Sequence, residues 1–260
     1  MDFGMPYLLE MRSIGACCAL AQSLGLSFVE LNASFPECQA DALNPADLRR
    51  LSRKHGVYFT LHLEDDCAPF CFNAAVRGAW RQTVRQALET AVALQMPIVN
   101  MHFPHGVHIT LPEEKVYLNA RYAEDFRAML ADFRALCEAV LLGTETRLAI
   151  ENTNGWQPHE QDAIAYLLES PVFGLTLDLG HAHGTNGADE AFYRAHEDRL
   201  IHMHGHDARG RQDHLALGDG EIDLKARFAL AAAQQARIVL ETKTATALRA
   251  SCMMLPQYLP

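Results

Sequence analysis

The chain has 260 residues, of which 49% are apolar and 21% are charged, a composition typical of a compact folded domain. These values exclude a disordered, collagen-like or membrane-spanning protein, since no run approaches about 18 consecutive apolar residues. The formal net charge of −10 disfavours a nucleic-acid partner or an acidic membrane surface, because like charges repel.

The start of the chain and its cysteines favour a cytoplasmic protein. The opening residues MDFGMP lack the basic and apolar regions of a signal peptide. The seven cysteines are odd in number and form no CxxC pair, which fits reduced thiols better than a disulfide framework. We therefore expect a reducing, cytoplasmic location.

Short β-like runs alternate with longer helical segments along the chain. We predict eight strands, at residues 2–7, 27–32, 57–63, 97–103, 147–152, 173–178, 199–204 and 237–242. Residues 74–95 and 113–142 carry apolar side chains at the 3.6-residue period of an amphipathic helix. Asn44 and Pro45 are start signals for a further helix, and Gly56 suits its C-terminal end.

This alternation of strands and helices favours a parallel sheet. Eight such units in 260 residues leave little room for elaboration, so we predict a single-domain (β/α)8 TIM barrel over residues 1–260. An open, doubly wound sheet is the alternative. No GxGxxG follows the first strand and no GxxxxGK[ST] occurs, so we expect no organic cofactor.

Polar side chains follow the predicted strands at the ends where a parallel barrel carries its active site. The strand ends hold Glu30, Asn32, His62, Glu64, His102, Glu151, Asn152, Asp178, His181, His204, His206, Asp207 and Glu241. Seven of the 13 histidines lie between residues 181 and 214. Imidazole and carboxylate groups are good ligands for divalent ions, which also remove the repulsion among clustered carboxylates. The sequence therefore predicts a metal site.

Three of these carboxylates, Glu151, Asp178 and Glu241, each follow an apolar strand that does not tolerate an unpaired charge. One such carboxylate alone is more often a helix cap or a solvated loop residue, but several together favour a shared ion. His202 and His204 share one strand face, and we assign His204 to the metal and His202 to the barrel interior.

Four segments resemble the xylose-isomerase-like superfamily of TIM barrels: ENTNG at 151–155, LTLDLGHAHG at 175–184, IHMHGHDARGRQDHLALGDGEID at 201–223 and VLETK at 239–243. The resemblance covers essentially the whole chain in element order. It implies a metal-dependent isomerase or epimerase of a small carbohydrate, sugar phosphate or hydroxy-keto acid. The superfamily also contains dehydratases and an apurinic-site endonuclease branch.

The resemblance also implies roles for particular residues. It places the family's single-metal quartet on Glu151, Asp178, His204 and Glu241, and the histidine of its DxxH motif on His181. The first and last glutamates of the quartet would also act as the acid and base pair. An oxygen-rich set of this kind suits one divalent ion, Mn²⁺, Mg²⁺ or Co²⁺, and also accepts Zn²⁺.

The predicted substrate-binding residues are His62, His102, His181, Arg209 and His214. His181 either donates a hydrogen bond to a substrate oxygen or orients Asp178. Arg209 and Arg211 could bind a terminal phosphate or carboxylate, although loop arginines are more often solvated. Trp156 either forms an apolar wall against a sugar or has an ordinary packing role.

The chain departs from the endonuclease branch at Gln212, where many relatives have Asp; Asp213 is displaced by one position. This departure weakens the prediction of a site with several metal ions. That site is still an alternative, because His62 and His102 match histidines with which the endonuclease branch holds three ions. A lyase or dehydratase that uses the same metal is the closest alternative function, and a non-catalytic sugar-binding barrel is a third. A homo-oligomer is also left open.

Overall fold

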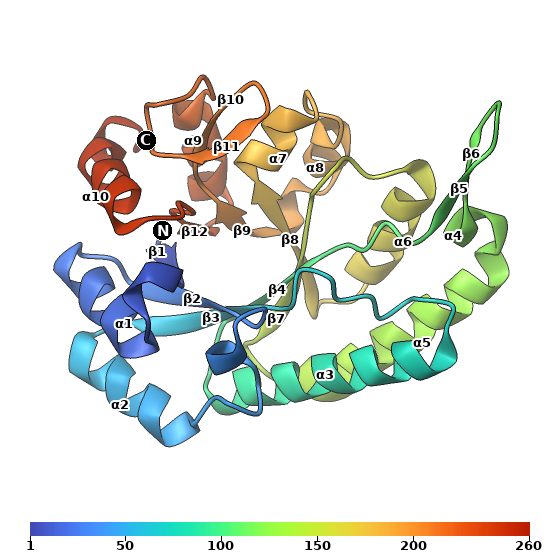
Figure 1. The fold of residues 1–260 in the computed structure, drawn as a ribbon, viewed down its shortest axis with the longest axis horizontal. Helices are drawn as coiled ribbons and strands as arrows, with labels where there is room; N and C mark the ends of the chain where they lie inside the picture. The colour runs from blue at the N-terminus through green and yellow to red at the C-terminus, as the bar shows by residue number, and fades with distance from the viewer.

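A computed structural model describes residues 1–260 and shows a closed barrel of eight parallel strands (Figure 1). Around the barrel the order is β1, β12, β9, β8, β7, β4, β3 and β2, and β2 pairs with β1 to close it. The strands are β1 (Phe3–Pro6), β2 (Phe28–Asn32), β3 (Tyr58–His62), β4 (Ile98–His102), β7 (Arg147–Glu151), β8 (Phe173–Asp178), β9 (Leu200–His204) and β12 (Arg237–Val239). Each lies within a predicted strand range, and the (β/α)8 TIM barrel is confirmed.

Helices follow the strands and surround the barrel. They are α1 (Ile14–Ser23), α2 (Pro45–His55), α3 (Ala74–Ala93), α4 (Leu118–Arg121), α5 (Ala123–Leu141), α6 (Pro158–Leu168), α7 (Leu179–Gly184), α8 (Glu190–Ala195), α9 (Leu224–Ala233) and α10 (Ala245–Met254). Short 3-10 turns lie at Leu9–Met11, Pro36–Cys38, Glu197–Arg199 and Leu255–Gln257. None of the helices combines the length and the apolar character needed to cross a membrane.

The predicted signals of α2 are present in the structure. The Asn44 side chain accepts hydrogen bonds from the backbone N–H groups of Ala46 and Asp47, which have no partner within the helix. Gly56 ends the helix with a φ of 67°, a left-handed conformation that glycine adopts without steric cost.

The helix predicted over residues 113–142 is wrong at its start. Residues Lys115–Tyr117 form β6, which pairs antiparallel with β5 (His108–Thr110). Leu111 N–H donates to the Glu114 carbonyl across the intervening turn, where Pro112 has no N–H to donate. The helical path therefore begins at α4, and the long helix α5 begins at Ala123.

Two hairpins extend the strand ends and were not predicted from the sequence. The β5–β6 hairpin projects from the body of the molecule (Figure 1). The second hairpin consists of β10 (Asp207–Arg209) and β11 (Gln212–Leu215), and it follows β9 directly. Both hairpins therefore lie on the side of the barrel where the strand-end polar residues gather.

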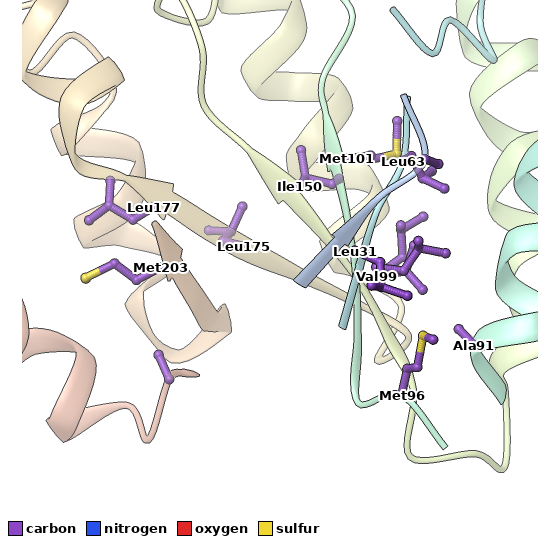
Figure 2. Close-up of a cluster of buried hydrophobic side chains, with 14 of the residues drawn as sticks. Leu31, Leu63, Ala91, Met96, Val99, Met101, Ile150, Leu175, Leu177 and Met203 are labelled. Atoms are coloured by element: carbon purple, nitrogen blue, oxygen red, sulfur yellow. The ribbon is translucent and has the colours of Figure 1, made fainter. Parts of the chain in front are cut away.

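Apolar and polar side chains alternate along the strands, and this alternation separates the apolar core from the polar interior of the barrel. The apolar members include Leu31, Val99, Met101, Ile150, Leu175, Leu177 and Met203, all buried. Figure 2 shows them in one cluster with Ala91 of α3, in the layer between strands and helices. Since neighbouring residues of a strand point to opposite faces, the polar residues between them point into the barrel.

Candidate metal centre

Four polar side chains from different strands meet at the mouth of the barrel. Glu151, Asp178 and His204 end β7, β8 and β9, and Glu241 follows β12 by two residues. His204 Nδ1 lies 3.2 Å from Glu151 Oε1 and 3.1 Å from Glu241 Oε2. The same nitrogen lies 3.6 Å from Asp178 Oδ2. The structure thus brings the predicted quartet together around one imidazole nitrogen.

This quartet is nearly closed to solvent. Glu151, Asp178 and His204 are at most 1% exposed, and the Glu241 side chain is 16% exposed. Asp178 Oδ2 is buried without a hydrogen-bond partner. Buried carboxylates this close together need a cation between them, because an unpaired buried charge is costly. The donor set of three carboxylates and one imidazole therefore fits a divalent ion.

Glu30 on β2 contacts the quartet from across the barrel. Its Oε1 lies 2.8 Å from His204 Nε2, and its Oε2 lies 2.9 Å from His202 Nε2. Thr60 donates a hydrogen bond to Oε2 at 2.9 Å. A carboxylate can only accept here, so His204 Nε2 donates to Glu30, and a metal ion bound at Nδ1 would take the place of the proton on that nitrogen. The assignment of His202 to the barrel interior is confirmed.

Three predicted substrate-binding histidines gather around Glu151. His62 Nε2 lies 3.2 Å from Glu151 Oε2, and Asn100 donates to the same oxygen. His102 Nε2 and His181 Nδ1 lie 3.5 and 3.6 Å from Oε1. His102 and Glu151 are register partners on neighbouring strands, which explains why they point the same way. Both carboxylate oxygens of Glu151 are thus surrounded by nitrogen atoms.

The histidines keep the glutamates ionised in spite of burial. Burial by itself raises the pKa of the Glu151 carboxyl, but attraction to His204 and His102 outweighs it and lowers that pKa well below its usual value. The same competition lowers the pKa of Glu241, where attraction to His204 and hydrogen bonds from His204 and His214 outweigh burial. Both glutamates are therefore anions near neutral pH, the form in which a carboxylate binds metal or accepts a proton.

Groups beyond the quartet contact Glu241. Its Oε1 lies 2.9 Å from Lys243 Nζ and 3.5 Å from His214 Nε2. His206 is fully buried, with Nδ1 3.8 Å from Glu241 Oε2 and Nε2 3.6 Å from Asp178 Oδ1. Neither ring nitrogen of His206 has a hydrogen-bond partner. The sequence places His206 at a strand end but gives it no role, and the structure places it against two members of the quartet.

Asp207 fixes the loop that follows His214. Its buried carboxylate accepts hydrogen bonds from four backbone N–H groups, those of Ala208, Gly218, Gly220 and Ile222, at 2.9 to 3.1 Å. A Cβ atom at Gly220 would lie 2.2 Å from Asp207 Oδ1, so the loop can approach this closely only with glycine there. Sequence reasoning missed this role, because the spacing does not show which amides face the carboxylate.

Three other expectations concern residues outside the quartet. Arg209 is exposed and donates to the Asp219 carbonyl at 2.8 Å. Trp156 is 4% exposed and stacks on Tyr193 at 5.4 Å between ring centroids, so of its two interpretations the packing role holds. His181 donates from Nδ1 to the Asn152 carbonyl at 3.0 Å, which leaves its Nε2 free for a further partner.

Fold and site together define a TIM barrel with a carboxylate and histidine cluster at the C-terminal ends of its strands. Residues 18–258 match the family model of the xylose isomerase-like TIM barrel. The chain belongs to this family. No protein of curated function matches its sequence.

Several solved structures are similar to this one. A D-tagatose 3-epimerase-like protein is 20% identical, with a TM-score of 0.75 and coverage of 99% of this chain and 97% of its own. The 3-keto-D-glucoside 4-epimerase from E. coli is 16% identical, with a TM-score of 0.76 and coverage of 99% and 98%. Endonuclease IV from Thermus thermophilus is 21% identical, with a TM-score of 0.71 and coverage of 99% and 100%. At these identities the similarity shows the fold alone.

Proposed function

We propose that this protein is a metal-dependent isomerase or epimerase of a small carbohydrate, sugar phosphate or hydroxy-keto acid. The observation that carries the proposal is the convergence of Glu151, Glu241 and Asp178 on His204 Nδ1 within 3.6 Å. Two of the similar structures are named as epimerases of sugars, which supports this substrate class.

The quartet would hold the ion, and its two glutamates would move the protons. A divalent ion bound there would act as a Lewis acid toward a substrate carbonyl. Glu151 and Glu241 each direct one oxygen toward His204 Nδ1 and keep the second oxygen against other groups. A proton on the carbon beside a carbonyl can then pass to one glutamate, and the other glutamate can return a proton.

The outcome depends on where that proton returns. Return to the same carbon from the opposite face gives an epimer, and return to the neighbouring carbon gives an isomer. The lowered pKa of both carboxyls keeps each of them ionised before the substrate enters, which is the form that can accept a proton. Glu241 is the more exposed of the two and therefore the one that meets solvent during exchange.

The proposal is tested by proton exchange in heavy water. Purified protein loaded with Mn²⁺ is incubated with ketoses, ketose phosphates and hydroxypyruvate, and deuterium incorporation at carbon is followed by proton NMR. Glu151→Gln and Glu241→Gln should each reduce exchange by about a hundredfold to ten-thousandfold, since each removes one acid or base. Glu89→Gln on the exposed side of α3 serves as the matched control. Near-normal exchange in either site variant would contradict the assignment.

Two related activities are the alternatives, and each has its own distinguishing result. Loss of water from the substrate would assign a dehydratase with the same proton abstraction. An apurinic-site phosphodiesterase is favoured only by the additional donors, His62 with His102 and His206 with His214, which lie beside the quartet. Two or three tightly bound Zn²⁺ ions per chain by elemental analysis would support that second function.

A further inference from the structure

A polar cavity of about 780 Å³ opens beside the metal centre. The β7–α6 loop, the helix α7 with the turn after it, and the β10–β11 hairpin form its walls, and no lining residue is apolar. His181 belongs both to this wall and to the surroundings of Glu151, whose Oε1 lies 3.6 Å from His181 Nδ1. His181 therefore lies between the cavity and the ligands of the candidate metal centre.

The lining of this cavity is unusual for a ligand site. Its volume falls within the range of about 300 to 1,000 Å³ that such sites have, but most of them are lined mainly by apolar and aromatic side chains. Because none of the residues that line this cavity is apolar and most of its surface is polar, a ligand that fills it gains little from burying carbon. Such a ligand must instead present oxygen atoms or charge to the walls.

The charged side chains of the cavity leave one cation without a partner. Asp213 is paired with His214 Nδ1 at 2.8 Å, and Glu221 is paired with His183 Nε2 at 3.0 Å. Arg211, at the turn of the β10–β11 hairpin, makes no hydrogen bond or ion pair with the protein. An arginine guanidinium matches the geometry of a phosphate or carboxylate group, which it binds through two parallel hydrogen bonds.

A second group of the wall, Thr153, is held by a chain of hydrogen bonds that ends on a buried carboxylate. Thr153 Oγ1 lies 2.8 Å from His105 Nε2, and His105 Nδ1 lies 3.0 and 3.1 Å from the two oxygens of Glu160. Glu160 is fully buried, and the backbone N–H of Gln157 also donates to it at 2.7 Å. Since a buried carboxylate requires donors, His105 Nδ1 carries a proton.

This arrangement directs the Thr153 hydroxyl proton. The hydrogen bond to Glu160 raises the pKa of His105, which favours the form with protons on both ring nitrogens. In that doubly protonated form Nε2 donates to Thr153 Oγ1 at 2.8 Å, and the hydroxyl proton of Thr153 is free to point elsewhere. Because Thr153 lines the cavity, that proton is available to an acceptor inside it.

We propose that this cavity is a subsite for a terminal anionic group of the substrate, a phosphate or carboxylate, with Arg211 as its cation and Thr153 as a hydrogen-bond donor. His105 and Glu160 are positioning residues that orient Thr153. The inference rests on the proposed function and narrows it, because it selects phosphorylated or acidic carbohydrates over neutral sugars.

Equilibrium binding tests the subsite without turnover. Inorganic phosphate and acetate are titrated by calorimetry into Mn²⁺-loaded wild-type protein, Arg211→Met, Thr153→Val and Thr153→Ser. Arg211→Met should weaken binding of the preferred anion about tenfold or more, as expected for a lost charge-assisted hydrogen bond, and Thr153→Val should weaken it severalfold. Thr153→Ser keeps the hydroxyl and should bind as the wild type does. Arg50→Met, on α2 in an exposed pair with Asp47, is the control.

The two anions separate the candidate groups, since tighter phosphate binding assigns a phosphate and tighter acetate binding assigns a carboxylate. Binding to Arg211→Met as tight as to the wild type, or no saturable binding of either anion, would overturn the subsite. Failure of the proposed function gives a different pattern, because anion binding would then persist while deuterium exchange is absent for every substrate.

Discussion

Glu30 is not a member of the quartet, but it contacts His204 and so affects how well that histidine can bind a metal ion. It joins His202 and His204 by hydrogen bonds of 2.9 and 2.8 Å, and Thr60 occupies part of its remaining accepting capacity. Burial by itself raises the pKa of Glu30, but the two histidines outweigh burial and lower it. An ionised carboxylate at this position makes His204 a better metal ligand, because it increases the electron density of the imidazole ring.

Substitution of Glu30 should therefore weaken metal binding without removing a metal ligand. In Glu30→Gln the side chain has one acceptor and one NH₂ group in place of two acceptors, so it cannot accept from both histidines. We expect the Mn²⁺ affinity to fall by about 10- to 100-fold, measured by calorimetric titration of the metal-free protein. Asp47→Asn on the exposed surface of α2 is the control. Equal Mn²⁺ affinity in Glu30→Gln and wild type would show that His204 needs no orienting carboxylate.

At the scale of elements, the β4–β5 connection is held to α6 by the His105–Glu160 pair. The contact joins a residue after β4 to the first turn of α6, where the Glu160 carboxylate also completes the capping of the helix. His105 is only partly buried, so solvent screens the pair and its effect on stability is modest.

The sign of the pH dependence follows from the raised pKa of His105. The pair stabilises the fold fully below the unfolded-state pKa of about 6.5, and this contribution is lost as the pH rises through the higher folded-state pKa. The difference in unfolding free energy between wild type and His105→Gln should therefore be larger at pH 6 than at pH 9. Urea unfolding at both pH values measures it. A difference that grows toward pH 9 would mean that His105 is not held in its charged form.

The sequence was informative about the elements whose pattern is local. Strand ranges, the capping residues of α2 and the extent of α3 follow from apolar periodicity and from residues such as Asn44 and Gly56. The two hairpins escaped prediction because their strands are only three or four residues long. Periodicity over so few residues does not distinguish strand from helix, so residues 113–117 were assigned to the neighbouring helix.

The candidate site likewise contains residues that the sequence predicts and contacts that it does not predict. Glu151, Asp178, His204 and Glu241 could be predicted because strand ends of a parallel barrel converge by topology. The contact of Glu30 with β9 could not be predicted, since β2 and β9 are not neighbours in the barrel and meet only across its interior. The same limit applies to Asp207, whose four donors come from a loop of irregular backbone.

At the scale of the whole molecule, the metal centre links four of the eight strands. The quartet joins the neighbouring strands β7, β8, β9 and the segment after β12, and Glu30 adds β2 from across the barrel. Without a cation, the anionic side chains of the centre face one another in a buried volume. An ion bound at this centre would therefore contribute to the stability of the barrel as well as to its chemistry.

Removal of metal should lower the thermal stability measurably. A ligand at 100 times its dissociation constant stabilises the native state by about 2.7 kcal/mol, which for a chain of this size corresponds to a rise in Tm of about 5–10 °C. Calorimetric scans with added Mn²⁺ and with EDTA measure this difference. Asp178→Asn should show a smaller response, because it loses one anionic ligand. An identical Tm under both conditions would argue against a bound ion.

Anomalous diffraction from a crystal grown with Mn²⁺ tests the account most directly, because it locates the ion independently of any substrate. We predict one strong anomalous peak bonded to Glu151, Asp178 and Glu241 and to His204 Nδ1, with His204 Nε2 still donating to Glu30. A crystal saturated with Mn²⁺ that shows no peak among these four side chains would contradict the account.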